Sequence, residues 1–105
     1  MPPVTASFHI PADHPAFAGH FPGRPIVPGV VLLDLALHAI ATATGLPVET
    51  GRLGQAKFLR PVGPDSTLTV QFETTPVGSI RFDIMDGTHK VASGVVTPHA
   101  DIPPP

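Results

Sequence analysis

The pattern of apolar and polar residues divides the chain into a short strand, a long loop, one helix and a run of strands. Apolar and polar residues alternate weakly over residues 5–10, which predicts a first strand. A helix is expected from Gly29 to about Thr44, because Pro28 stands at its start and Gly45 follows its end. After a short loop the period changes to two, and four more strands are expected over residues 53–62, 66–75, 79–85 and 90–97.

The expected helix is apolar nearly all round, which is typical of a buried central helix. Its polar exceptions are Asp34, His38 and Thr42, which follow one another at intervals of four and so form one narrow stripe. The last strands are rich in β-branched residues, as in an antiparallel meander. Together these elements predict an α+β domain in which an antiparallel sheet wraps around a single helix.

The length and composition predict one small domain that assembles with other chains. The 105 residues fit a single domain over residues 1–105, in which residues 98–105 are expected to form a flexible tail. Hydrophobic residues make up 42% of the chain and charged residues only 13%, so little polar surface is available to cover the outside. We therefore expect an oligomer in which an interface covers the excess apolar surface.

Charge and cysteine usage exclude several classes of function. The formal net charge is −2 and the six Lys and Arg form no basic run, which argues against binding to nucleic acid. The absence of Cys excludes a disulfide framework, a thiolate nucleophile and a Cys-based zinc site. No signal peptide is recognised, and the longest apolar stretch is interrupted by Pro28, Asp34 and His38, which argues against a membrane span. We expect a cytoplasmic protein.

The loop over residues 11–28 holds five prolines and two glycines. Proline fixes φ and glycine permits left-handed angles, so a loop of this composition follows one specified path. Linkers rarely carry several aromatic, aliphatic and imidazole side chains, whereas this loop contains His14, Phe17, His20, Phe21 and Ile26. We therefore expect a rigid loop and not a linker.

The end of this loop and the start of the helix carry a motif. Residues 20–34 read His-Phe-Pro-Gly-Arg-Pro-Ile-Val-Pro-Gly-Val-Val-Leu-Leu-Asp. This run closely resembles the active-site signature of the (3R)-hydroxyacyl-[acyl-carrier-protein] dehydratases of the hotdog superfamily, in which an acid on the central helix lies fourteen positions after the histidine. Residues 57–62 read Lys-Phe-Leu-Arg-Pro-Val and resemble, more weakly, the family's strand that enters an Arg-Pro-Val turn. The resemblance covers residues 5–97 and implies a hotdog fold and a lyase of fatty acid biosynthesis without a cofactor.

The identity of the acid at position 34 makes the chain more similar to some subgroups of this family than to others. Many of these dehydratases carry Glu there, whereas Asp34 is similar to the bifunctional dehydratase-isomerases and to the short dehydratases of aryl-polyene pathways. The compact length is more similar to the second group. In the family, the histidine and the acid of one pocket come from different subunits. The resemblance therefore implies a homodimer, a higher assembly of dimers or a heterodimer with another hotdog chain, with His20 paired to a partner's Asp34.

The chemistry of dehydration fits these residues. A base must take the proton from the carbon alpha to the thioester, and an acid must protonate the departing 3-hydroxyl. His20 is a suitable base, because free imidazole titrates near pH ~6.5. Helical side chains lean toward the helix start, so Asp34 can face the same pocket as the acid. Gly29 opens the helix, whose free N–H groups stabilise the charge that develops on the thioester oxygen.

Other residues are assigned to the substrate and its carrier. The expected substrate contacts are Phe21, Pro22, Gly23, Pro28, Val30 and His38. Acyl carrier protein is acidic, so cations near the pocket mouth would meet its phosphopantetheine arm. The candidates are Arg24, Lys57 and Arg60, for each of which an ordinary solvated role is the alternative. Acyl-CoA is the alternative donor of the acyl group.

Several alternatives stay open. The family usually carries Gln where this chain has His38, which either bonds Asp34 and holds it ionised or replaces the Gln as a donor. His9, His14 and His20 are five and six positions apart, a spacing that matches no common zinc geometry, so no metal is expected. The rival functions are thioester hydrolysis and a non-catalytic hotdog subunit that binds acyl carrier protein. The acyl chain and any isomerase activity are left undetermined.

Overall fold

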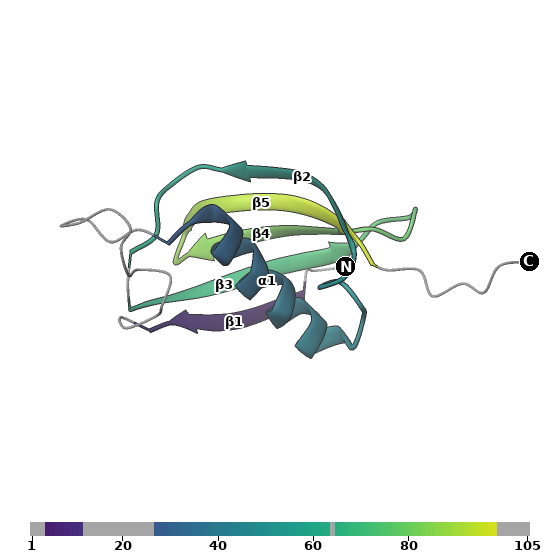
Figure 1. Ribbon diagram of the computed structural model, residues 1–105, viewed down its shortest axis with the longest axis horizontal. Helices are drawn as coiled ribbons and strands as arrows, with labels where there is room; N and C mark the ends of the chain where they lie inside the picture. The colour runs from purple at the N-terminus through teal and green to yellow at the C-terminus, as the bar shows by residue number, and fades with distance from the viewer. Residues whose placement is uncertain (1–3, 12–26, 64, 99–105) are drawn as a thin grey trace, which may run out of the picture.

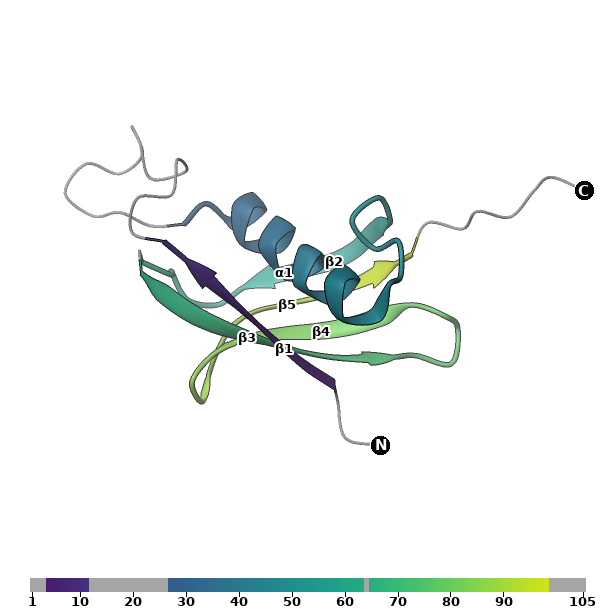
Figure 2. The same cartoon turned by 90° about the horizontal axis from the view of Figure 1, so that it is seen from below.

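A computed structural model describes residues 4–11, 27–63 and 65–98. Within them, five strands form one antiparallel sheet in the order β1-β3-β4-β5-β2, and a single helix lies across one face of that sheet (Figure 1). Figure 2 shows the helix and the sheet as two layers. This is the expected α+β architecture of a hotdog fold. The elements are β1 (Val4–Ile10), α1 (Gly29–Thr44), β2 (Arg52–Phe58), β3 (Ser66–Thr74), β4 (Ile80–Asp86) and β5 (His89–Thr97).

Helix α1 begins and ends where its local signals predict. Pro28 is the N-terminal cap, and its carbonyl accepts the N–H groups of Val31 and Leu32 at 3.0 and 3.1 Å. Gly45 takes a left-handed φ of 74° at the other end and donates its N–H to the carbonyl of Ala41 at 2.8 Å. The expected helix bounds are therefore confirmed.

One face of α1 is buried against the sheet and the opposite face is open. The buried face consists of Leu32, Leu33, Ala36, Leu37 and Ile40. Alternate residues of β3 and β4 point toward it, and all of them are buried: Leu68, Val70, Phe72, Ile80, Phe82 and Ile84. The expectation of a helix buried nearly all round is thus correct for one face only.

The open face of α1 carries the expected polar stripe. Asp34, His38 and Thr42 are all exposed. Val30, one turn before Asp34, extends the stripe and is 67% exposed. The helix therefore presents an apolar residue followed by an acid and an imidazole, which we call the α1 stripe (Val30, Asp34, His38 and Thr42).

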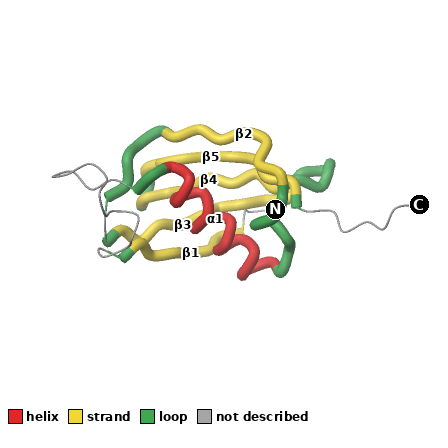
Figure 3. Tube along the Cα trace, viewed as in Figure 1, coloured by secondary structure: helices red, strands yellow, loops and turns green. Residues whose placement is uncertain are grey.

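The sheet has a strand order that the sequence pattern did not specify, and its strand β2 is shorter than expected. Strands β3, β4 and β5 form the expected meander, and β2 pairs with β5 (Figure 3). In addition, β2 ends at Phe58 and not at Val62. The N–H groups of Leu59 and Arg60 both donate to the single carbonyl of Val91, at 2.9 and 3.3 Å, so the regular ladder stops there.

Strand β2 forms one edge of the sheet, and all seven of its residues are exposed. Its register with β5 shifts between Leu53 and Gln55, where a bulge interrupts the pairing. An edge strand presents unpaired N–H and C=O groups that can pair with another chain. Among the described residues, no helix has the length and apolar character to span a bilayer.

Candidate active site

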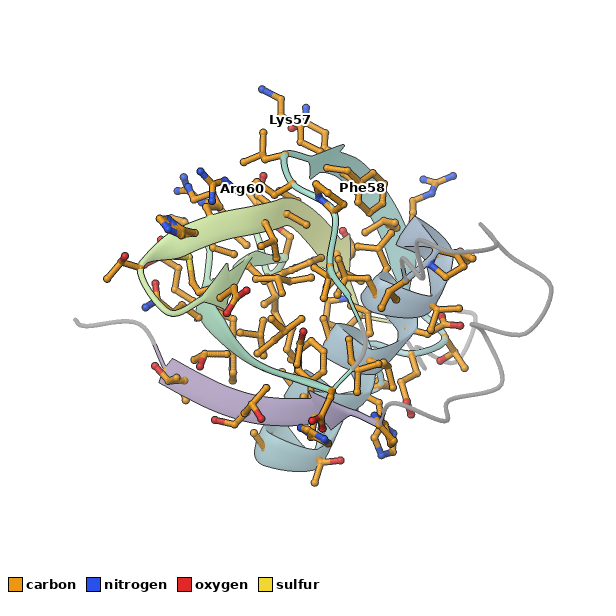
Figure 4. All side chains as sticks on the ribbon, turned by 90° about the vertical axis from the view of Figure 1, so that its left-hand side faces the viewer. Lys57, Phe58 and Arg60 are labelled. Carbon is orange, nitrogen blue, oxygen red and sulfur yellow. The ribbon has the colours of Figure 1, made fainter. Side chains whose placement is uncertain are left out.

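A groove of about 420 Å³ lies at the start of helix α1. The backbone N–H of Val27 donates to the carbonyl of Val62 at 2.7 Å, which ties the segment before the helix to the segment after β2. Figure 4 shows Phe58 on the side of β2 that faces the helix. The groove is lined by Val27, Gly29, Leu32, Phe58, Leu59, Arg60, Pro61 and Val62.

Gly29 opens α1 at a point where a side chain has no room. A Cβ built on Gly29 would lie 2.7 Å from Cζ of Phe58 and 2.8 Å from its Cε1. Within the described parts of the chain, the N–H groups of Gly29 and Val30 donate to no backbone acceptor. Such free N–H groups at the positive end of a helix attract a developing negative charge. The groove therefore offers hydrogen-bond donors beside an apolar wall.

Asp34 lies on the exposed α1 stripe and does not line this groove. It is five residues beyond Gly29, a rise of about 7.5 Å along the helix axis. None of the described residues forms an ion pair or a side-chain hydrogen bond with it. The described residues thus place Asp34 and Gly29 on the same helix but not in one groove.

His38 binds a residue that the sequence did not indicate. Its Nδ1 lies 2.7 Å from Oε1 of Glu49, in the loop after α1. The hypothesis that His38 bonds Asp34 is therefore wrong for this structure, because the bond found for His38 among the described residues is to Glu49 and not to Asp34. No helical spacing rule links positions 38 and 49, since the helix ends between them at Thr44.

His9, on β1, is held by two partners that were also not foreseen. Its Nδ1 lies 2.9 Å from Oγ1 of Thr67, and its Nε2 lies 3.1 Å from Oδ1 of Asp65. Asp65 has a left-handed φ of 58°. Across the described ranges, no three His, Cys, Asp or Glu side chains are grouped so as to hold a metal ion.

A second groove of about 420 Å³ separates β1 from the C-terminal half of α1. His9 and His38 both line it, on opposite sides. Its other lining residues are mostly small or apolar: Ala6, Ser7, Phe8, Leu35, Ala39, Thr42 and Ala43.

The two described cations that were expected to meet a carrier lie in different grooves. Arg60 lines the groove at the start of α1. Lys57 points away from the helix, and lines a groove on the other face of the sheet with Arg81, Asp83 and Lys90 (Figure 4). Only Arg60 is therefore next to Gly29.

Most of the expected loop residues fall outside the described part of the chain. These are His14, Phe17, His20, Phe21, Pro22, Gly23, Arg24 and Ile26. Residues 99–105 of the expected tail over residues 98–105 also fall outside it. Among the expected substrate contacts, Pro28 caps α1 while Val30 and His38 lie on the α1 stripe.

Comparison with known proteins identifies the family. The model of the ApeI-like family, described as ApeI dehydratase, matches residues 2–95. The 3-hydroxyacyl-[acyl-carrier-protein] dehydratase FabZ of Chlamydia trachomatis is 37% identical in an alignment of 79 residues, and the match covers 67% of this chain and 52% of that protein. FabZ of Klebsiella pneumoniae is 38% identical in an alignment of 89 residues, and the match covers 70% of this chain and 56% of that protein. The chain thus spans about half the length of the curated relatives it matches.

Similar solved structures share the fold. The dehydratase heterocomplex ApeI:P from Xenorhabdus doucetiae matches with a TM-score of 0.72 and 22% identity, over 93% of this chain and 98% of that one. The fluoroacetyl-CoA thioesterase FlK matches with a TM-score of 0.66 and 22% identity, over 89% of this chain and 80% of that one. Since dehydratases and a thioesterase share the architecture, the fold alone does not select the reaction. The match over residues 2–95 does select a family, and the chain belongs to the ApeI-like dehydratases.

Proposed function

We propose that this chain dehydrates a 3-hydroxyacyl thioester, carried by acyl carrier protein, to the trans-2-enoyl thioester. Its membership of the ApeI-like family supports this reaction. The structural observation that carries the proposal is the start of α1, where Gly29 leaves two N–H groups beside an apolar groove. A thioester oxygen that gains negative charge is stabilised by such donors.

In the proposed reaction, His20 removes the proton from the alpha carbon, and the electrons of that C–H bond form the new C=C bond. The C–O bond to the 3-hydroxyl breaks at the other end, and Asp34 protonates the departing oxygen so that it leaves as water. Gly29 and Val30 hold the thioester oxygen through their N–H groups while charge builds on it. Proton return from His20 to Asp34 completes the cycle.

The proposed site is shared between two chains. Asp34 is exposed on the α1 stripe in the single chain, and Val30 beside it is 67% exposed. Strand β2 is an open sheet edge. A partner that covers these surfaces would exclude water from Asp34, which strengthens every electrostatic interaction in the site. The partner is a second copy of this chain or another hotdog chain.

The carrier would approach at the start of α1. Arg60 lines that groove, and we assign its guanidinium a contact with the phosphate of a phosphopantetheine arm. We assign Arg24 the same role. Lys57 lies in a different groove, so we assign it a contact with the surface of the carrier and not with the arm.

The test is the activity of His20→Ala and Asp34→Asn on a 3-hydroxyacyl thioester, measured as formation of the enoyl product. Loss of a catalytic acid or base lowers the rate by roughly 10²–10⁴-fold. His89→Ala and Asp86→Asn are matched controls, because both residues are exposed and far from the proposed site in the sequence. Full activity in either site variant would disprove the assigned roles.

Mixing the two inactive variants tests the shared site. In a random mixture about half of the dimers contain one chain of each kind, and one of their two sites then has both native residues. We expect the mixture to recover up to about a quarter of the native activity. No recovery would place both residues of a site on one chain.

Two further assays separate the rival functions. Release of free thiol from a saturated acyl thioester, without enoyl product from the hydroxyacyl substrate, would identify a thioesterase. A chain that is inactive alone and active only with a second hotdog chain would be one half of a heterodimer. The same assays, run with acyl carrier protein and with coenzyme A, identify the carrier.

A further inference from the structure

The position of His38 on α1 favours a contact with Asp34. The two residues are four apart, so their side chains are neighbours on the surface of the helix. Helical side chains lean toward the helix start, which turns the ring of His38 toward Asp34. A protonated imidazole there would form an ion pair with the carboxylate and hold it ionised, unable to give a proton.

The structure shows the ring of His38 drawn to a different acid. Its Nδ1 is 2.7 Å from Oε1 of Glu49. This contact leaves Asp34 without a described partner, although it lies only one turn away. The acceptor of His38 therefore comes from the loop beyond the helix and not from the helix itself.

The loop that carries Glu49 is well anchored. The neighbouring side chain, Val48, is fully buried, and its N–H donates to the carbonyl of Leu46 at 2.8 Å. Gly51 donates to the carbonyl of Val48 at 3.0 Å and packs so closely on the backbone of Thr97 that a Cβ would collide with it. Glu49 is thus held beside His38 by the backbone on both sides.

We propose that Glu49 is a positioning residue, whose carboxylate holds His38 away from Asp34 and so keeps Asp34 free to donate its proton. This inference rests on the proposed function of Asp34. The side chains of His38 and Glu49 are 69% and 50% exposed in the single chain, so solvent screens their attraction. The effect of losing Glu49 is therefore modest, at about five-fold, the upper range for an exposed ion pair.

The experiment measures kcat/KM for the 3-hydroxyacyl thioester in the assembled protein. Glu49→Ala removes the acceptor, frees the imidazole to reach Asp34 and lowers kcat/KM by about five-fold. Glu49→Gln keeps an amide oxygen that accepts the N–H of His38, so its loss is smaller than that of Glu49→Ala. Asp86→Ala, the removal of another exposed acid, controls for a general effect of lost charge.

A second substitution separates positioning from a structural role. In the His38→Gln background no imidazole remains to pair with Asp34, so adding Glu49→Ala causes no further loss. A loss of equal size in both backgrounds would show that Glu49 only supports the loop, and would overturn the proposal. Thermal unfolding of each variant identifies any loss that follows from instability.

The outcomes also separate this inference from the proposed function. If Asp34→Asn is inactive while Glu49→Ala has native activity, the role of Glu49 is wrong and the role of Asp34 stands. If Asp34→Asn is fully active, the proposed function itself fails. A five-fold loss that disappears in the His38→Gln background supports both.

Discussion

Substituting Gly29 by Ala separates the reaction from the stability of the fold. The added methyl would lie 2.7, 2.8 and 3.2 Å from three carbons of the Phe58 ring, where ordinary contacts are 3.4–4 Å. The ring must therefore retreat by about 1 Å to reach a normal carbon–carbon distance. Phe58 is 53% exposed, so it has space to do so.

The expected change in stability is small. Ala is better than Gly in a helix by up to about 1 kcal/mol, and this gain offsets the cost of moving a half-exposed ring. We expect the free energy of unfolding of Gly29→Ala to lie within about 1 kcal/mol of the native value. The same methyl, however, occupies the space through which a thioester oxygen would reach the first N–H groups of α1.

The expected change in activity is large. Loss of one oxyanion donor lowers kcat by roughly 10²–10³-fold, so we expect Gly29→Ala to lose about 10²-fold in kcat. Enoyl formation and urea unfolding, measured on the same preparation, give both quantities. Native activity would refute the role of Gly29. Recovery of activity in Gly29→Ala/Phe58→Ala would refute it too, because the loss would then come from the displaced ring and not from the methyl.

Two further substitutions test the core and the assembly. Gly94→Ala would place a Cβ 2.6 Å from Cζ of Phe82, which is 1% exposed, and 2.8 Å from the backbone carbonyl oxygen of Gln55. We expect it to cost about 1–3 kcal/mol in urea unfolding, and an unchanged midpoint would contradict this account. Val30→Asp should leave the unfolding of the single chain unchanged, since Val30 is 67% exposed. It should raise the dissociation constant of a two-fold dimer about thirty-fold, because each of the two copies loses ~1 kcal/mol of apolar burial. Light scattering over a range of protein concentrations measures this constant, and an unchanged dimer would contradict the prediction.

The helix could be predicted from the sequence because its signals are local. Pro28 and Gly45 mark its two ends within a residue, and both act through their own backbone geometry. The end of β2 could not be predicted in this way. It depends on Leu59 and Arg60 sharing the carbonyl of Val91, more than thirty residues away in the sequence.

The strand that pairs with β2 could not be predicted from the sequence either. A period of two identifies a strand and its faces, but it does not say which strand pairs with it. Consecutive strands usually pair, which favours β2 beside β3, yet β2 lies beside β5 and leaves β3 to pair with β1. The open edge at β2, and with it the surface available to a partner, follows from this long-range choice.

The candidate site likewise has parts that could be predicted from the sequence and parts that could not. The α1 stripe could be predicted, because residues four apart share a face of any helix. The bond from His38 to Glu49 joins the helix to the loop that follows it, and Phe58 approaches Gly29 from a different element. Neither contact could be predicted from the spacing of residues within one helix or strand. The roles of His20, Phe21, Pro22, Gly23 and Arg24 stay predictions from the motif.

In the single chain, the residues that stabilise the fold are different from the residues that are proposed for the reaction. Its core lies between the buried face of α1 and the sheet, and Gly94 acts there through the packing of Phe82. The residues proposed for the reaction lie at the start and on the open face of the same helix, where Val30 and Asp34 are exposed. A partner surface that buries Val30 would cover Asp34 as well, because residues four apart on a helix are only about 6 Å from each other. Assembly of the protein would then also exclude water from the carboxyl group of Asp34. A folded but unpaired chain is therefore expected to be stable and inactive.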